Sequence, residues 1–240
     1  MNLFYDAINL ILPQKCSVCG GILGDPTTVF GVESPVCFSC LKSIVPNPSD
    51  KRWFLCLSEP YSGDPYPKLT LYMPFMYKGF FSRAIPVIKF GKNQDLALFL
   101  GVFLGLLLKS DGVTGDIIVP VPLSEERFKE RGFNQAEVIS QKVGELLGVP
   151  VVNDCLLRIR NTQRQTAIKD KIYRSKNVEG AFKVSDNWSV ENLRILLIDD
   201  VVTTGNTIHE AAIELKRMGA KQVVCISLAG NRAYKNAESY

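Results

Sequence analysis

Short apolar runs alternate with longer amphipathic stretches over most of the chain after Leu69. The short runs are rich in β-branched residues, which is typical of strands buried on both faces of a parallel sheet. We expect strands at Leu71–Tyr77, Ile117–Val121, Val151–Ile159, Ala181–Val184, Ile195–Ile198 and Val223–Leu228. We expect helices at Phe81–Phe90, Gln94–Lys109, Asn134–Leu147 and Ile208–Met218. This alternation predicts an α/β fold in which helices cover both faces of a parallel sheet.

The most informative stretch is Ile195–Thr207, which reads ILLIDDVVTTGNT. Its apolar run ends at Asp199 and Asp200, so we expect both carboxylates at the carboxyl end of a buried strand, where open α/β sheets bind ligands. The next turn, Thr203–Thr207, leads into a helix whose free N–H groups and dipole favour a phosphate. The acids suit ribose hydroxyls, a magnesium ion or both. The chain has neither a G-x-G-x-x-G nor a G-K-[ST] motif, which argues against a Rossmann or P-loop site.

A second candidate anion site follows the strand Ile117–Val121. Val121 and Pro122 end this strand, and the basic residues Arg127 and Arg131 come soon after. Because neighbouring strand ends line the same crevice of a parallel sheet, this segment is suited to a polyanion. The alternative is an ordinary solvated loop, with Asn134 as the cap of the next helix.

Positive charge is concentrated in one part of the chain. Residues 127–176 carry eleven Lys/Arg against five Asp/Glu, a local excess of +6 compared with +4 for the whole chain. Within them Arg160–Lys176, which contains Arg164 and Arg174, is a polar loop between two expected strands. Loops of this length in a compact domain are usually functional or disordered. A solvated basic face is the structural alternative, and single-stranded DNA is a further option, although Tyr173 is the only aromatic residue available for stacking.

Two C-x-x-C pairs, Cys16/Cys19 and Cys37/Cys40, are separated by seventeen residues. This spacing is typical of a structural zinc site with four thiolate ligands. The intervening segment is too small and turn-rich to fold on an apolar core of its own, so a metal would stabilise it. A redox pair or unliganded thiols are the alternatives. A closed four-sulfur site has no open position, and we assign it no catalysis.

Composition and charge bound the remaining possibilities. The stretch Leu96–Leu108 is shorter than the roughly 18 residues of a membrane span and is expected to be a buried helix. No secretory signal is visible in the first residues, which predict a short amphipathic helix ending at Pro13, and seven cysteines do not suggest a disulfide framework. We therefore expect a cytoplasmic protein. We divide it into residues 1–45 (helix and zinc module), 46–69 (linker, with a short hairpin near Trp53–Leu57) and 70–240 (the α/β domain).

The thirteen residues Ile195–Thr207 resemble the signature of type I phosphoribosyltransferases, which bind phosphoribosyl pyrophosphate (PRPP). Three further sequence motifs are more specific than the fold. They are R-G-F-N-Q at Arg131–Gln135, the string Arg158–Gln165, and R-x-x-N-V-x-G-A-F at Arg174–Phe182. Together with the cysteine pairs they resemble the ComF family, which joins a cysteine-rich zinc module to a type I phosphoribosyltransferase domain. Many relatives carry a further cysteine pair, where this chain has only Cys56.

The resemblance implies a fold, ligands and partners. It implies a type I phosphoribosyltransferase fold that binds PRPP with Mg²⁺, a structural Zn²⁺, a mobile basic loop that closes over PRPP, and a role in DNA uptake and natural competence. Asp199 and Asp200 would then be the catalytic residues, which contact the ribose and magnesium and need not act as general acid and base. The implied PRPP-binding residues are Val121, Pro122, Arg127, Arg131, Arg164, Arg174, Val201, Thr203, Thr204, Gly205, Asn206 and Thr207.

Two functions from different classes remain open at this point. The first is an enzyme that transfers phosphoribose to a nitrogenous acceptor with release of pyrophosphate. The second is a PRPP-responsive module without turnover that contacts DNA or competence proteins. Nucleic-acid binding by the zinc module alone is weaker, because Gly20–Val36 contains no Lys or Arg. The single histidine, His209, is given no role as a base, and the oligomeric state stays open, with a homodimer among the options.

Overall fold

The fold was analysed in a computed structural model of the chain. It describes residues 13–23, 28–29, 32–47, 53–56, 69–160 and 180–230. The predicted N-terminal helix and nearly all of the basic loop Arg160–Lys176 lie outside these residues.

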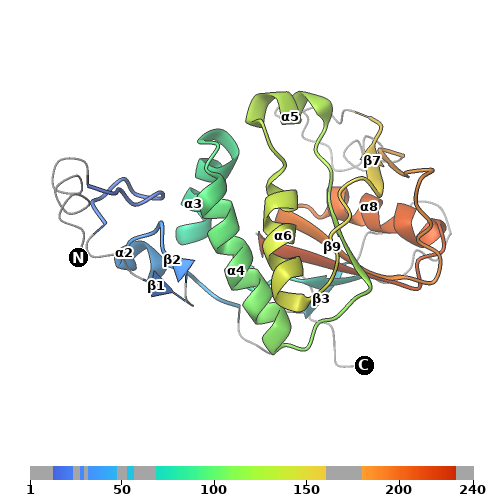
Figure 1. Cartoon of the computed structure of the whole chain (residues 1–240), viewed down its shortest axis with the longest axis horizontal. Helices are drawn as coiled ribbons and strands as arrows, with labels where there is room; N and C mark the ends of the chain where they lie inside the picture. Colours follow the sequence, from blue (N-terminus) through green and yellow to red (C-terminus); the bar gives the residue numbers. More distant parts are fainter. Residues whose placement is uncertain are drawn as a thin grey trace.

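A largely parallel sheet forms the centre of the molecule (Figure 1). Its strands run in the order β3 (Trp53–Cys56), β4 (Leu69–Tyr72), β10 (Gln222–Gly230), β9 (Arg194–Val202) and β6 (Ile117–Pro120). β4, β10, β9 and β6 are parallel, β3 is antiparallel to β4, and the short β5 (Phe75–Met76) pairs with β10. β9 lies inside the sheet, between β10 and β6, as its uninterrupted apolar sequence predicts.

Helices cover both faces of the sheet. One face packs against α3 (Phe80–Phe90), α4 (Gln94–Ser110) and α6 (Gln135–Leu147), and the other against α8 (Asn206–Arg217) and the hairpin of β7 (Leu156–Arg158) with β8 (Phe182–Val184). Within Ile195–Ile198, alternate residues of β9 belong to the two cores, because successive side chains of a strand point to opposite faces. The predicted α/β architecture with helices on both faces is therefore confirmed.

Several predicted boundaries were wrong for local reasons. The expected strand Val151–Ile159 is a single bridge at Val151 followed by β7, because the turn residues Asn153 and Asp154 interrupt it. The expected strand Leu71–Tyr77 divides into β4 and β5 around Pro74, which cannot donate to a ladder. Instead of forming a hairpin inside the predicted linker, β3 adds an edge strand to the main sheet.

A four-residue helix, α2 (Phe38–Leu41), and the small pair β1 (Thr28–Val29) with β2 (Val32–Glu33) belong to the N-terminal module. The module lies beside α3 and α4, at the left of Figure 1. Cys16, Val36 and Cys40 are part of the same buried cluster as the α3 and α4 side chains. The module is thus packed onto the domain.

The apolar helix α4 is buried against α6, as predicted for Leu96–Leu108. Gly101 of α4 lies at the crossing, where a Cβ atom would lie 3.0 Å from the backbone oxygen of Ile139. In the described ranges, no helix is long and apolar enough to cross a membrane.

We expect Gly101→Val to lower the free energy of unfolding by about 1–3 kcal/mol, because the added atoms must push the backbones of α4 and α6 apart. Urea titration monitored by circular dichroism measures this change. The matched control is Ser110→Val at the exposed end of the same helix, for which we expect a change within about 0.5 kcal/mol. Equal losses in both variants would contradict the close packing at Gly101.

Candidate functional site

The two predicted acids lie inside β9, which extends to Val202 and not only to Ile198 as expected. Asp199 and Asp200 are neighbours in a strand, so their side chains point to opposite faces of the sheet. The backbone N–H of Asp200 donates to Oδ1 of Asp199 over 2.8 Å, and that of Val201 donates to Oδ1 of Asp200 over 2.8 Å. The main chain thus fixes one oxygen of each carboxylate.

Asp200 faces α3 and is paired with a cation that sequence reasoning missed. Oδ2 of Asp200 lies 2.9 Å from Nζ of Lys89, and the two side chains are 8% and 16% exposed. The hydroxyl of Ser227 donates to the Asp200 carbonyl oxygen over 3.5 Å. No sequence pattern marks Lys89, because a basic residue in the last turn of a helix is common.

Asp199 lies in a different electrostatic environment. Burial raises the pKa of Asp199 to about 7, and the adjacent charge of Asp200 adds to this shift while Lys89 opposes it. A carboxyl group shifted in this way gains from a neighbouring cation, because the cation stabilises its charged form. The position is therefore suited to binding a metal ion or accepting hydrogen bonds from ligand hydroxyls.

The predicted phosphate loop follows directly after the acids. Thr203 and Thr204 are exposed, and Gly205 precedes α8 with a left-handed φ of 82°. Gly205 has no side chain that could cap the first turn, and its carbonyl accepts the first helical bond, from the N–H of His209. The preceding amides of the helix start, at Asn206 and Thr207, therefore face the loop, which favours an anion.

The second predicted loop lies at the same edge of the sheet. β6 pairs with β9 in parallel, and the N–H of Val121 donates to the carbonyl of Ile198. Asn134 caps α6 as expected, and its Nδ2 also donates to the carbonyl of Val121 over 3.1 Å. Pro122 follows in the loop and is half-buried. Val121 and Pro122 are thus held close to the end of β9.

The basic residues after Pro122 form a helix, α5 (Glu125–Arg131), and not the loop that we expected. Ser124 caps this helix and Glu125 lies in its first turn, signals that the sequence contains and that sequence reasoning passed over. Lys129 points to solvent and pairs with Glu125 over 2.6 Å. Arg127, by contrast, is half-buried.

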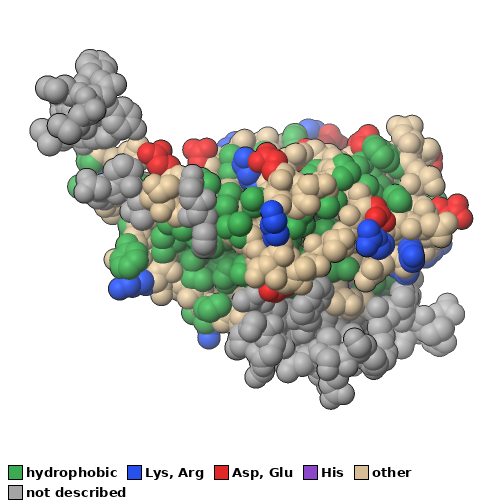
Figure 2. Space-filling view, turned by 60° about the horizontal axis from the view of Figure 1, so that its bottom comes forward, with side chains coloured by type: hydrophobic (Ala, Val, Ile, Leu, Met, Phe, Trp, Pro, Cys, Tyr) green, Lys and Arg blue, Asp and Glu red, His purple; other side chains and the backbone are tan. Residues whose placement is uncertain are grey.

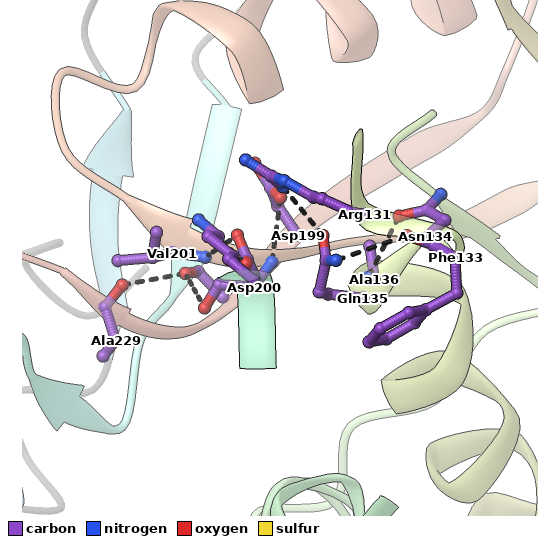
Figure 3. Close-up of polar contacts among 11 residues, drawn as sticks. Arg131, Phe133, Asn134, Gln135, Ala136, Asp199, Asp200, Val201 and Ala229 are labelled. Carbon is purple, nitrogen blue, oxygen red and sulfur yellow. Dashed lines mark hydrogen bonds and ion pairs between the residues drawn. The ribbon is translucent and has the colours of Figure 1, made fainter. Parts of the chain in front are cut away.

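Arg131 at the end of α5 is only 7% exposed and extends toward the two acids (Figure 3). Its Nη1 donates to Oε1 of Gln135 over 2.8 Å, and its buried Nε has no hydrogen-bond partner in the described part of the chain. Burial lowers the pKa of Arg131, and the negative charges of Asp200 and Asp199 oppose this shift. A buried guanidinium whose Nε–H has no acceptor in the described part of the chain is suited to binding an anionic ligand.

The structure adds a further arginine, Arg158 on β7. Burial lowers its pKa, Arg127 adds to the shift and Asp199 opposes it, so its charge lies near both groups. The guanidinium also stacks over the ring of Phe182, with its Cζ 5.4 Å from the ring centroid. The sequence placed Arg158 in a family-like string without giving it a role. The predicted ligands Arg164 and Arg174 lie outside the described residues.

His209 is buried in α8, and burial lowers its pKa. His209 therefore occupies a packing position inside the domain. Cys155 and Cys225 are fully buried.

The four predicted metal ligands, Cys16, Cys19, Cys37 and Cys40, come together. Their sulfur atoms lie within 4.8 Å of one another, and the sulfurs of Cys19 and Cys37 are 3.7 Å apart. Four thiolates around a tetrahedral zinc ion at about 2.3 Å would be separated by roughly 3.8 Å. The donor set and its spacing are therefore compatible with structural zinc.

The thiol pKa values agree with this reading. Burial raises the pKa of Cys16, but backbone N–H groups of Cys37, Cys19 and Val18 outweigh it and bring the value to about 6. Burial and the neighbouring cysteines raise the pKa of Cys40 to about 12. Sulfurs packed so closely repel one another as thiolates, and a divalent cation removes that repulsion.

The cysteine module is connected to the start of α3. The N–H of Phe80 donates to the carbonyl of Ser43 over 3.3 Å, and a Cβ atom on Gly79 would lie 2.6 Å from the same oxygen. Gly79 also has a φ of 57°, so this close approach depends on glycine. Asn93, the cap of α4, donates to the hydroxyl of Ser17 over 3.1 Å.

Comparison with known proteins agrees with this geometry. The profile of the phosphoribosyl transferase domain matches residues 130–240. Competence protein F of Haemophilus influenzae is 35% identical over 116 residues, covering 48% of this chain and 50% of that protein. DNA utilization protein YhgH of Escherichia coli K12 is 34% identical over 152 residues, covering 60% and 66%. Competence protein ComFC of Bacillus subtilis is 38% identical over 96 residues, covering 40% and 36%.

Solved structures similar to the chain include adenine phosphoribosyltransferase from Leishmania tarentolae. It is 13% identical, with a TM-score of 0.38, over 75% of this chain and 83% of that one. The matched family profile and the sheet described above define a phosphoribosyltransferase-type domain, preceded here by a four-cysteine module. The chain belongs to the ComF family, and it spans between about a third and two thirds of the length of the three relatives compared here.

We expect the purified protein to contain about one zinc ion per chain, and Cys16→Ser to lose most of it, because each sulfur supplies one of four bonds. Elemental analysis measures the metal. Cys155→Ser is the matched control, since Cys155 is a buried thiol away from the cluster, and it should keep its zinc. Zinc-free wild-type protein with an unchanged melting temperature would contradict the structural role.

We expect Arg131→Met to weaken the binding of inorganic pyrophosphate by about tenfold or more, because it removes a buried donor whose charge-assisted bonds are strong. Isothermal titration calorimetry measures the affinity. Lys129→Met removes the same charge from the exposed face of the same helix and should cost less than about twofold. Equal losses would mean that only overall charge matters.

Proposed function

We propose that this protein binds PRPP together with Mg²⁺ and transfers phosphoribose to a nitrogenous acceptor, releasing pyrophosphate. The proposal rests on one arrangement: the amide-lined start of α8, the adjacent acids and the buried Arg131 all lie at one edge of the sheet. The names of the relatives, competence protein and DNA utilization protein, support a role in DNA uptake. The proposal includes the cytoplasmic location that the sequence predicts.

The 5-phosphate of PRPP would bind at Thr203–Thr207. The amides at the helix start and the exposed hydroxyls of Thr203 and Thr204 supply donors, and the left-handed Gly205 allows the backbone to turn around the anion. Val201 and Asn206 flank this turn. The loop is short and begins directly after β9, so a sugar attached to the phosphate would reach back over the acids.

The ribose and the magnesium ion would lie at the acids. Carboxylate oxygens are ligands that Mg²⁺ prefers, and a bound cation would offset the effect of the burial that raises the pKa of Asp199. When bound, Mg²⁺ would neutralise charge on the pyrophosphate. The sugar hydroxyls would donate to the remaining carboxylate oxygen.

The pyrophosphate would lie between the loop at Val121 and Pro122 and the arginines Arg127 and Arg131. Arg164 and Arg174 remain candidates from the basic loop. In the reaction, the lone pair of the acceptor nitrogen forms the bond to C1 of the ribose, and the C1–O bond breaks with its electrons leaving on pyrophosphate. The acceptor nitrogen then releases its proton to solvent. Cations beside the leaving group would stabilise the charge that develops on it.

The charged side chains of the described residues can be followed on one face of the molecule (Figure 2). On the face in Figure 2, the Lys, Arg, Asp and Glu side chains of the described residues are interspersed and form no continuous basic stripe. Proteins that follow a nucleic-acid backbone present such a stripe.

We expect wild-type protein to bind PRPP with Mg²⁺ in a saturable way, and Asp199→Asn to reduce the affinity by about tenfold or more, because the amide cannot replace a charged oxygen ligand. Isothermal titration calorimetry measures both. Asp186→Asn, which changes an exposed aspartate paired with Lys183, is the control and should bind as wild type. Absence of PRPP binding by the wild-type protein would refute the proposal.

Turnover is tested separately, by measuring pyrophosphate release with a panel of nitrogenous acceptors. Release that depends on both an acceptor and Asp199 supports the transferase. Saturable PRPP binding with no release from any acceptor would favour a PRPP-responsive module of the competence system.

A further inference from the structure

The buried ion pair between Lys89 and Asp200 divides the roles of the two acids. Lys89 lies in the last turn of α3, far from β9 in the sequence, and its Nζ lies 2.9 Å from Oδ2 of Asp200. A lysine in a last helical turn is usually exposed and serves the helix dipole. This one is 16% exposed, and burying an ammonium group is costly unless it is paired. The contact is therefore specific.

Both oxygens of Asp200 are already engaged by the protein. Oδ1 accepts the N–H of Val201 over 2.8 Å. Oδ2 is fully buried and has no aligned hydrogen bond within the described ranges, so Lys89 is its counter-charge. A ligand approaching from solvent would have to displace Lys89 to reach this oxygen.

Asp199 is arranged in the opposite way. Its Oδ1 accepts the N–H of Asp200 over 2.8 Å, and its side chain points to the other face of the sheet. Its side chain is partly exposed, whereas that of Asp200 is buried, and of the two acids it is Asp199 whose charge acts on Arg158. Both acids act on Arg131, Asp200 more strongly. Asp199 is thus the acid that remains open to a ligand.

The pair also changes the charge of the site. Two adjacent carboxylates beside a phosphate loop would repel a ligand that carries a phosphate and a pyrophosphate. Lys89 cancels one of these two negative charges, that of Asp200. The remaining charge, on Asp199, is the one that a cation or ribose hydroxyls can use.

We propose that Lys89 is a positioning residue that holds Asp200 as a structural anion, so that Asp199 alone contacts the ribose or its cation and the site accepts a polyanion. This inference rests on the proposed PRPP binding. It assigns unequal roles to two acids that the sequence presents as equivalent.

The experiment compares four proteins by calorimetry with PRPP and excess Mg²⁺: wild type, Lys89→Met, Lys89→Arg and Lys89→Met/Asp200→Asn. Each is titrated in parallel with ribose 5-phosphate, which lacks the pyrophosphate. We expect Lys89→Met to lose about tenfold or more in PRPP affinity and clearly less in ribose 5-phosphate affinity, since the repulsion grows with ligand charge. Lys89→Arg keeps the charge and should retain most of the affinity.

The double variant decides between positioning and direct contact. It removes both members of the pair, so no unpaired charge stays buried, and it should fold and recover most of the affinity lost in Lys89→Met. Urea titration of the same proteins reports whether each is folded. No recovery in a folded double variant would mean that Lys89 or Asp200 contacts PRPP directly, and would overturn the inference.

Two other outcomes separate this inference from the proposed function. Wild-type protein that binds PRPP while Lys89→Met binds it equally well would overturn the role of Lys89 and leave the proposed function standing. Wild-type protein that does not bind PRPP would overturn both. Equal losses for PRPP and ribose 5-phosphate would indicate a general structural defect and would also count against the proposal.

Discussion

The burial of β9 on both faces is the constraint on which the arrangement of the site depends. Ile195–Ile198 have no solvent exposure, so this strand must lie inside the sheet with helices on both sides. Its carboxyl end then meets the end of β6 at one edge. Because side chains alternate along a strand, two adjacent acids there project into two different environments. A single buried strand thereby supplies both a partnered and an open carboxylate.

α3 connects the two parts of the molecule. At its start, Phe80 bonds to the carbonyl of Ser43 in the cysteine module, and near its end Lys89 pairs with Asp200. The helix is eleven residues long and packs in the same core as Cys16 and Cys40. The folded state of the cysteine module and the position of Lys89 are therefore linked through one helix, α3. This gives the module a structural reason to accompany the domain.

Local signals explain which elements the sequence predicted well. The strands β6, β9 and β10 and the helices α4, α6 and α8 follow from uninterrupted apolar runs and regular amphipathic patterns, although β9 proved longer than expected. The strand expected at Val151–Ile159 was wrong, because the prediction followed the apolar residues of this segment, whereas its turn residues interrupt the strand in the structure. The basic run Arg127–Arg131 has a charge that is typical of a loop, but Ser124 caps it as the start of a helix.

The sequence by itself determined the parallel α/β class, the four-cysteine cluster and the loop after the acids, because each depends on residues close together in the chain. It could not identify the partner of Asp200, nor select Lys89 and Arg158 among many basic residues. Those roles depend on which side chains from distant elements become buried against each other. Desolvation then makes the choice of partner decisive, and only the packed tertiary structure decides it.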